Sequence, residues 1–572
     1  LDRLGSAREV AQTGAVIGRE FTRELLGAVA GQSDAVLEQS LRQLVQSELL
    51  FRSGVPPVTR YAFKHALVQQ AAYESLPRSR RAALHARIAE VLVALDPGLE
   101  ATQPDLLAWH CEQAGLIEAA VSHRASAAWR SASRGAYAEA RGQCASALRL
   151  IATLPDGSRR DRMSLEVLAC LSEAIVLQRG YANREAVDVQ VRAQELWERL
   201  GRPVEFVGVI RDRWQFHFTR SETGLAQELA DKLLQSSRRQ ADPRYTVWGH
   251  TLAGGSALVR GELLEAIRHL QEGLRLMRSC SEDPSSLWRD HKTPRGPWTA
   301  WAHLTTRLGY AKCWLGYPDQ ALACLSSVIE RAPQMGWEPA RVVYSILRVQ
   351  IGSFFTDGAG LAQATKALSK RISELDLALY KAMATIYQGH VVSCCEDPEG
   401  GIAVMQRGME AYHASGTVIW SGHYHALLAE AYQRVGRLHE ARRLLAEAQH
   451  LAGRTGERWY DAELARRLGE LDRQQGDTSA AERRLQQALA TARRQHARLW
   501  ELHAATSLAR LWHGQRRSAE ARAVLAPVYG WFGEGLQTAS LRSAKVLLDE
   551  LDQGTGQIFQ QGYHQDPFRT CS

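Results

Sequence analysis

Apolar and polar residues follow one another along most of this chain with the spacing of amphipathic helices joined in pairs. The clearest pair is HALLAEAYQRVGRLHEARRLLAEAQ, residues 425–449. Apolar residues recur there every three or four positions, which places them on one side of a helix, and Gly436 interrupts the pattern near its middle. The stretch predicts two antiparallel helices with a turn at Gly436.

The same pattern returns at intervals of about 40 residues. Ala441 belongs to a set of positions that we call the alanine row: Ala140, Ala186, Ala226, Ala266, Ala321, Leu361, Gly401, Ala441, Ala481 and Ala521. Most steps in the row are 40 residues long. The longer step from Ala266 to Ala321 spans a polar, Pro-containing insertion at 279–301, which we interpret as a long loop that could face a ligand.

Other positions keep step with the alanine row. Twelve residues earlier lies the small-residue row: Ala128, Ala174, Trp214, Gly254, Gly309, Val349, Gly389, Ala429, Gly469 and Ala509. Glycines precede the alanine row by five residues in half of the repeats, and leucines follow it by four. Two helices approach closely only where small side chains face each other, and a short turn tolerates left-handed backbone best at glycine. The register therefore predicts about ten stacked hairpins between residues 101 and 550.

This pattern resembles the tetratricopeptide repeat, in the longer form of about 40 residues. The resemblance implies an all-α, right-handed superhelical array, in which each hairpin buries its apolar face against its neighbours. The register is weakest around 340–375.

A set of aromatic residues also recurs at steps of 40. Tyr380, Trp420, Tyr460 and Trp500 lie near the start of successive first helices. They could line the inner groove and offer a partner protein or a small effector an apolar surface. Alternatively, they pack one repeat against the next, as regular aromatic residues usually do.

The pattern changes in the first hundred residues. AQTGAVIGREFTRELLGAVAG predicts a helix that reaches about Ala30, and Ser33 or Asp34 begins a second one. FRSGVPPVTRYAF then predicts two short strands about a Pro-Pro turn, followed by another helix. Two helices, a hairpin and a further helix are typical of a small winged-helix domain, which we place at residues 21–100.

LDRLGSAREVAQTGAVIGREF, LVQSELLFRSG and YAFKHALVQQAAYESLPRSRRAALHARIAEVL resemble the segment that follows the ATPase core in large bacterial signalling ATPases of the AAA or STAND type. Many of these carry a class III adenylate or guanylate cyclase domain. The resemblance implies that residues 1–20 end an upstream ATPase lid region, and that the chain, which starts at Leu1, is a fragment of a longer cytoplasmic protein.

In STAND ATPases, a Met-His-Asp motif after the winged helix contacts the phosphates of bound ADP. His65 lies in the corresponding place, and Lys64 could add charge. The match is incomplete, because Ala66 replaces the aspartate and Phe63 replaces the methionine with a one-residue offset. The resemblance implies nucleotide sensing by His65 in the intact parent; the alternative is that His65 only orients the hairpin.

The chain lacks a Gly-x-x-x-x-Gly-Lys-Ser/Thr motif and contains no Gly-Lys pair. We therefore predict no enzymatic activity and no cofactor for this chain, with ATP or ADP and Mg²⁺ implied only for the intact parent. His390 and Cys394 have zinc-compatible helical spacing, but no second ligand pair is visible nearby, so we predict no metal site and structural thiols.

Charge and composition restrict the classes of partner that the chain can bind. The formal net charge of +8 is small over 572 residues, and most basic residues are arginines interleaved with glutamates, which is typical of a solvated helical surface. No stretch approaches the ~18 consecutive apolar residues of a membrane span. Nine cysteines without regular spacing suit reduced thiols. The last residues, 551–572, have the composition of a disordered tail.

Two functions remain open at this stage. The first is a non-catalytic module that binds a partner or effector along the array and controls the upstream ATPase domain. The alternative is a transcription regulator whose winged helix binds DNA, with PRSRRAALHAR, 77–87, contacting phosphates. Glu38 and Glu48 on the candidate reading helix argue against nucleic acid as a partner.

Overall fold

A computed structural model of the chain describes Gly5 and residues 7–54, 59–181, 183–237, 242–280, 283, 298–356, 358–373 and 377–562. The chain forms two compact units, residues 1–131 with 138–171, and residues 132–137 with 172–572. Each unit is described by itself below.

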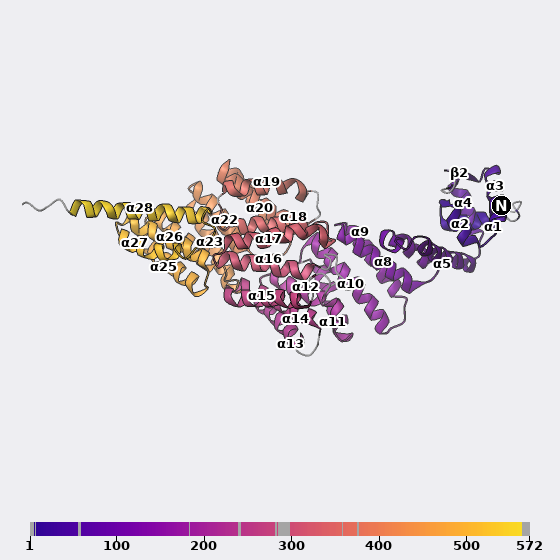
Figure 1. Cartoon of the computed structure of the whole chain (residues 1–572), viewed down its shortest axis with the longest axis horizontal. Helices are drawn as coiled ribbons and strands as arrows, with labels where there is room; N and C mark the ends of the chain where they lie inside the picture. Colours follow the sequence, from indigo (N-terminus) through magenta and orange to yellow (C-terminus); the bar gives the residue numbers. More distant parts are fainter. Residues whose placement is uncertain are drawn as a thin grey trace, which may run out of the picture. The chain divides into compact units, whose positions relative to one another are not determined.

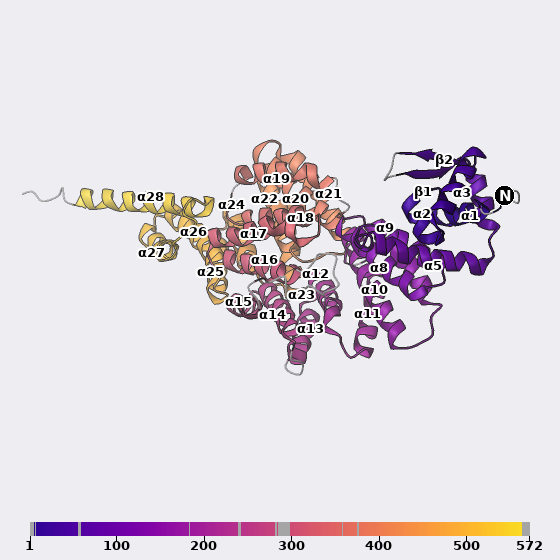
Figure 2. The ribbon, with the colours of Figure 1, turned by 45° about the vertical axis from the view of Figure 1, so that its right-hand side comes forward.

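The first unit begins with helices around a three-stranded antiparallel sheet (Figure 2). The elements are α1 (Ala7–Ile17), β1 (Glu20–Thr22), α2 (Arg23–Ala30), α3 (Asp34–Gln46), β2 (Leu50–Ser53), β3 (Arg60–Phe63), α4 (Ala66–Glu74) and α5 (Arg78–Leu95). The strand order is β1-β3-β2, with Phe21 opposite Tyr61 and Leu50 opposite Phe63. Val10, Val16 and Leu41 pack in one core with these strands.

The single helix predicted to reach Ala30 is wrong, because the chain breaks after Ile17 and forms β1 before α2. The ring of Phe21 on β1 packs against Gly14, where an added Cβ would lie 2.7 Å from it. A three-residue strand is too short for its alternating pattern to stand out from the flanking helices. The two predicted strands and the helix after them are present, and α6 (Leu99–Thr102) and α7 (Pro104–Gln113) follow α5.

Ten helix pairs follow in the described residues, each joined by a short turn, and within the second unit the successive pairs from α12 to α27 lie side by side (Figure 1). They are α8 (Ile117–Ser133) with α9 (Tyr137–Ile151), α10 (Ser158–Arg179) with α11 (Arg184–Arg199), α12 (Gly208–Thr219) with α13 (Thr223–Ser237), α14 (Pro243–Val259) with α15 (Leu263–Cys280), α16 (Thr299–Trp314) with α17 (Pro318–Arg331), α18 (Ala340–Gly352) with α19 (Gly358–Ser373), α20 (Ala378–Cys395) with α21 (Pro398–Ala414), α22 (Ser421–Arg434) with α23 (Leu438–Thr455), α24 (Asp461–Gln474) with α25 (Thr478–Arg494), and α26 (Arg498–Gly514) with α27 (Ser518–Tyr529).

The predicted register is confirmed in these pairs. Every position of the alanine row lies on a second helix and is buried, and every position of the small-residue row lies on a first helix. The two rows meet inside each pair: a Cβ added to Gly309 would lie 2.5 Å from the side chain of Leu325 and 3.2 Å from the carbonyl of Ala321. The turn glycines Gly316 and Gly436 have φ angles of 94° and 78°, as a left-handed turn position requires.

Pairs that are five apart in the array also contact each other, which the repeat pattern did not predict. The carbonyl of Thr219, at the end of α12, accepts hydrogen bonds from the amides of Val418 and Ile419, at 2.7 and 2.9 Å. In the next pair, the carbonyl of Val259, at the end of α14, accepts a hydrogen bond from the amide of Arg458 at 2.8 Å. The C-terminal end of each of these first helices therefore contacts the linker that leads into the pair five positions later in the array.

The next pair, α16 with α17, also contacts the pair five positions later. A Cβ added to Gly316, in the turn between α16 and α17, would lie 2.8 Å from Arg498 and 2.6 Å from the ring of Trp531. The carboxylate of Glu534 accepts hydrogen bonds from the amides of Asp319 and Gln320 at the start of α17. Because these contacts recur in successive pairs, the second unit winds back on itself and leaves less open groove than a loosely wound array would.

Two predicted segments fall largely outside the described residues. Within the 279–301 insertion, α15 ends at Cys280 and α16 begins at Thr299, while residues 281–282 and 284–297 are not described. In the predicted tail at 551–572, α28 (Ala539–Gly562) covers the first part and residues 563–572 are not described. Among the described helices, none is long and apolar enough to cross a membrane.

A candidate binding cavity and a polar network in the helix array

A cavity of about 130 Å³ lies inside the second unit, among the first helices α12, α14, α16, α18 and α20. The chain of α21 and the linker before α22 close it on another side through Tyr412, Ile419 and Trp420. Aromatic rings supply much of its wall: Tyr181, Phe218, Tyr310, Trp337, Tyr344, Tyr380, Tyr412 and Trp420. The winding of the array creates this cavity, because pairs five apart both contribute to its wall.

Stacked rings form one side of the cavity. The rings of Tyr310 and Trp420 lie 5.4 Å apart at an angle of 11°, and Phe218 meets Trp420 edge-on at 6.4 Å. The Tyr310 hydroxyl donates a 2.5 Å hydrogen bond to Gln350, and the Tyr412 hydroxyl donates one to the carbonyl of Ile419 at 2.6 Å. These bonds hold the rings in place, since a buried tyrosine hydroxyl needs a partner.

A small polar group lies beside these rings. The guanidinium of Arg307, on α16, stacks over the rings of Trp214 and Phe218 at 4.9 and 5.7 Å. Its nitrogens donate to the side chain of Gln215 at 3.4 Å and to the carbonyl of His303 at 3.3 Å. The cavity thus combines aromatic walls with one held cation, an arrangement typical of small-molecule sites.

The four predicted aromatic residues fall into two groups. Tyr380 and Trp420 line the cavity. Tyr460 and Trp500 are 4% and 2% exposed and pack against each other edge to face, at 5.3 Å. Binding of a partner by any of the four stays a prediction, and in this arrangement Tyr460 and Trp500 leave little surface for one.

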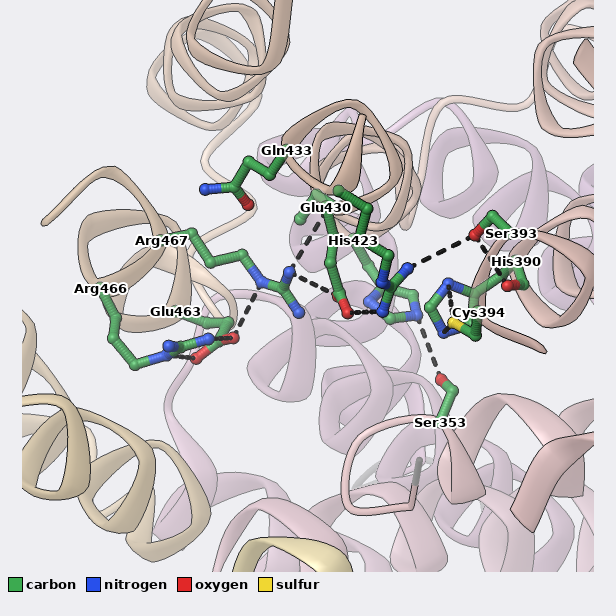
Figure 3. A network of polar contacts seen from close by, with 12 residues as sticks. Ser353, His390, Ser393, Cys394, His423, Glu430, Gln433, Glu463, Arg466 and Arg467 are labelled. Atoms are coloured by element: carbon green, nitrogen blue, oxygen red, sulfur yellow. Dashed lines mark hydrogen bonds and ion pairs between the residues drawn. The ribbon is translucent and has the colours of Figure 1, made fainter. Parts of the chain in front are cut away.

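A polar network runs along the first helices α20, α22 and α24 (Figure 3). Glu463, 2% exposed, forms ion pairs with Arg466 at 2.6 Å and Arg467 at 2.9 Å, and Arg467 also reaches Glu430 at 2.8 Å. Despite burial, the arginines lower the pKa of Glu430 to about 2, and that of Glu463 also falls. Both carboxylates therefore stay charged near neutral pH, which makes the network a fixed ion cluster.

Neutral histidines extend the network. His423 contacts Ser353 at 3.2 Å and Tyr460 at 3.3 Å, and burial holds its pKa well below the usual value. His390 and Cys394 lie on one face of α20 with sulfur–nitrogen distances of 3.8 and 3.9 Å (Figure 3). Among the described residues, no group of three or more His, Cys, Asp or Glu side chains could hold a metal ion.

His65 and Lys64 lie in the first unit, after β3. His65 is exposed and precedes α4, which starts at Ala66. Lys64 forms an ion pair with Glu48 at 2.9 Å, and its amide donates to the carbonyl of Leu49 at 3.1 Å. The histidine is thus available to a neighbouring domain, while the lysine already holds a carboxylate. A nucleotide contact by either residue stays a prediction.

Residues 421–494, which span α22 to α25, match the tetratricopeptide repeat family. The array is tetratricopeptide-like. Arrays of this kind present surfaces for binding other proteins, which makes the second unit a regulatory or protein-binding module.

One curated relative, the uncharacterized protein R02095 of Rhizobium meliloti (strain 1021), is 32% identical over 201 residues. The match covers 35% of this chain and 19% of the relative, so the chain spans about a fifth of the length of that protein.

Several solved structures are similar at low identity. A Rap protein complexed with competence and sporulation factor gives a TM-score of 0.42 at 10% identity, over 66% of this chain and 98% of that one. The Cut9–Hcn1 hetero-tetramer of the APC/C gives 0.39 at 13% identity, over 76% and 84%. A STAND protein with a tetratricopeptide repeat sensor from Pyrococcus horikoshii gives 0.26 at 12% identity, over 96% and 65%.

Sequence reasoning missed Arg307. It lies two residues before Gly309 of the small-residue row, and the same position holds Leu252, Tyr387 and Leu427 in other pairs. Other pairs hold Asp212 and Ser507 there, so the register gave no signal that sets Arg307 apart. Arg467, the centre of the polar network, stands at the equivalent place in its own pair.

Proposed function

We propose that this chain is the regulatory, non-catalytic part of a multidomain bacterial signalling ATPase, of the kind that also occurs fused to class III cyclase domains. In this proposal the array binds a protein or small effector and controls a nucleotide switch in an upstream ATPase domain. The intact protein would use ATP or ADP with Mg²⁺ and work in the cytoplasm.

The observation that carries the proposal is the order of the two parts. A helix–strand–helix–helix–hairpin region, the element order of a winged helix, is followed by the helices α4 to α7 and then by a tetratricopeptide-like array of ten described pairs. This is the order of parts that the sequence resemblance implies after an ATPase core. The exposed His65, shortly after β3, supports a contact with that core, because its side chain makes no capping hydrogen bond at the start of α4.

Control of this kind requires an effector that binds two states of the array with different affinities. The contacts between pairs five apart supply a second observation in favour, because they join distant parts of the array, which a bound effector could shift relative to one another. Opening or closing them would change the shape of the cavity, since Phe218 and Trp420, which both line it, come from the two sides of the contact at Thr219.

The experiment uses the complete protein encoded by the reading frame to which this chain belongs. We expect it to contain a P-loop and to bind ADP, and we expect His65→Ala to speed ADP release by at least about tenfold, the loss of one charge-assisted hydrogen bond. The control is His439→Ala, an exposed histidine on α23. A reading frame without any nucleotide-binding segment, or equal release rates for the two variants, would contradict the proposal.

A further inference from the structure

We infer that the cavity in the second unit binds a small, flat and uncharged aromatic molecule that carries a carbonyl group, and that the indole N–H of Trp420 donates a hydrogen bond to that carbonyl. This names the chemical class of the effector and therefore rests on the proposed function. An unpaired donor, a strained backbone at the same residue, and the charge and size of the cavity support the inference.

Trp420 supplies a hydrogen-bond donor without an acceptor. Its side chain lines the cavity and is 8% exposed, and among the described residues its Nε1 has no hydrogen-bond partner. The indoles of two neighbouring tryptophans are paired: Trp459 donates to the carboxylate of Glu457 at 2.7 Å, and Trp500 donates to the carbonyl of Trp459 at 3.1 Å. A buried tryptophan N–H normally has a partner. A ligand in the cavity would supply the missing acceptor.

The backbone of the same residue is strained. Trp420 precedes α22 with φ at 67° and ψ at −1°, in the left-handed region that a bulky side chain rarely adopts. Tyr460, at the equivalent place in the next pair, has φ at −106°. Strain of this kind persists only where the surroundings impose it, and it is concentrated at functional sites. It singles out Trp420, rather than its repeat equivalent, as the binding residue.

The surroundings hold the indole of Trp420 in one orientation. Its backbone amide donates a 3.0 Å hydrogen bond to the buried carboxylate of Glu457. Its ring stacks on Tyr310 at 5.4 Å and 11°, and meets Trp459 edge-on at 5.1 Å and 75°. An anchored backbone and two ring contacts fix the direction of the N–H bond before any ligand arrives, which lowers the entropy cost of binding.

The charges in the wall favour an uncharged ligand. The described lining contains no Asp, Glu or Lys, and its one permanently charged residue, Arg307, is already engaged. The guanidinium stacks over the rings of Trp214 and Phe218 and donates hydrogen bonds to two oxygen atoms. An ionised ligand would lose its water here without gaining an unengaged counter-charge. A carbonyl oxygen needs only the neutral N–H that Trp420 offers.

The size of the cavity limits the ligand to one ring. Apolar cavities of ~150 Å³ take up benzene. At about 130 Å³, this cavity therefore admits a single aromatic ring with a short substituent, and it is too small for a peptide of more than one residue. Aromatic rings supply much of the wall, and their flat faces and polar edges suit an aromatic ring better than a branched aliphatic group.

The test uses three probes of the same size and nearly the same shape. Acetophenone carries the carbonyl, isopropenylbenzene replaces its oxygen by a methylene group, and benzoate carries a charge. Binding to the unaltered chain is measured by saturation-transfer NMR and calorimetry. We expect acetophenone to bind one molecule per chain, and benzoate to bind at least about tenfold more weakly. No saturable binding of acetophenone up to about 5 mM, or equal binding of benzoate, would overturn the inference.

A variant isolates the hydrogen bond. Trp420→Phe keeps an aromatic ring and removes the N–H, so acetophenone should bind about threefold to tenfold more weakly, while the affinity for isopropenylbenzene should change by less than about twofold. Trp531→Phe is the matched control, because Trp531 is 37% exposed and lies outside the lining, and it should change neither affinity. Equal losses for both probes in Trp420→Phe would show that only shape is recognised and would contradict the inference.

A second measurement needs no variant. With isotope-labelled tryptophan indoles, one N–H signal should move downfield with bound acetophenone relative to bound isopropenylbenzene. A hydrogen bond deshields the proton, whereas the ring currents of the two probes are alike. The absence of such a signal would refute the donor role of Trp420 even if Trp420→Phe fails to fold.

These binding outcomes are separate from the proposed ATPase coupling, which the rate of ADP release tests. Carbonyl recognition by Trp420, in a protein whose reading frame lacks a nucleotide-binding segment, would uphold the cavity site and refute the proposed function. Failure of acetophenone to bind, in a protein whose ADP release depends on His65, would do the reverse.

Discussion

The hydroxyl of Ser221 donates a 2.7 Å hydrogen bond to the carboxylate of Glu457, which lies 236 residues further along the chain. The same carboxylate accepts from the amide of Trp420 at 3.0 Å and from the indole of Trp459 at 2.7 Å. Glu457 therefore joins the turn after α12 to the linkers of two later pairs. Burial raises its pKa, which shows that the three donors do not fully offset its loss of water.

Removing this carboxylate should loosen the array. Glu457→Ala leaves three buried donors without an acceptor, so we expect the free energy of unfolding of the second unit to fall by about 2–4 kcal/mol in urea titrations. Glu447→Ala, on the exposed face of α23, removes only a surface ion pair and should change it by less than about 0.5 kcal/mol. A similar small effect at both positions would mean that Glu457 does not join the turns.

The close approach of paired helices predicts a large effect of one methyl group. A Cβ at Gly401, in the alanine row, would lie 2.4 Å from the backbone nitrogen of Ser393, so Gly401→Ala must push α21 away from α20. We expect a loss of about 2–3 kcal/mol. Gly453→Ala makes the same change in α23, where nothing lies within 4 Å, and should stabilise the protein by about 0.5–1 kcal/mol. Thermal unfolding that ranks the two variants the other way would refute the packing described.

A pair of buried histidines predicts sensitivity to mild acid in the first unit. The Nδ1 atoms of His85 and His110 lie 2.9 Å apart, and burial lowers the pKa of each to about 4. Because the folded pKa lies below the unfolded value of ~6.5, their contribution is present above pH 6.5 and is lost as the pH falls towards 4.

We expect the free energy of unfolding of the first unit to fall by about 3 kcal/mol across that range. His110→Gln should flatten the dependence, and His439→Gln, at an exposed histidine, should leave it unchanged. The measurement is urea unfolding between pH 4 and 7, and an equally steep profile for His110→Gln would exclude the pair as its source.

The ion cluster on the first helices predicts that two arginines contribute very different amounts to the free energy of unfolding. Arg467→Met removes one of the two arginine partners of the buried Glu463 and also a partner of Glu430, so we expect a loss of about 3–5 kcal/mol. Arg443→Met breaks only the exposed pair with Glu447 and should cost less than about 0.5 kcal/mol. Chemical unfolding of the two variants measures the difference, and comparable losses would show that the cluster contributes no more than a surface pair.

The sequence predicted the array well because its register depends on local contacts. Gly309, Ala321 and Leu325 meet within one hairpin, so their fixed spacing is visible along the chain. Even Leu361, in the weakest part of the register, is buried in its second helix. Local spacing of this kind is the information that a single sequence carries most directly.

The cavity could not be predicted in the same way. It depends on how far each pair rotates relative to the previous one, and small rotations add up over five pairs before Thr219 meets Val418. Trp420 was identified as an aromatic at a regular step, but its neighbour Tyr310 lies 110 residues earlier, and no pattern along the chain connects them.

The most direct test of the regulatory role is the rate of ADP release from the complete protein carrying Glu457→Ala, compared with the same protein carrying Glu447→Ala. If the array controls a nucleotide switch, loosening its turns should change the release rate by at least about fivefold, which corresponds to a coupling free energy of about 1 kcal/mol. Glu447→Ala should leave the rate as it is in the unaltered protein. Identical rates in all three proteins, or no ADP bound to any of them, would contradict the account.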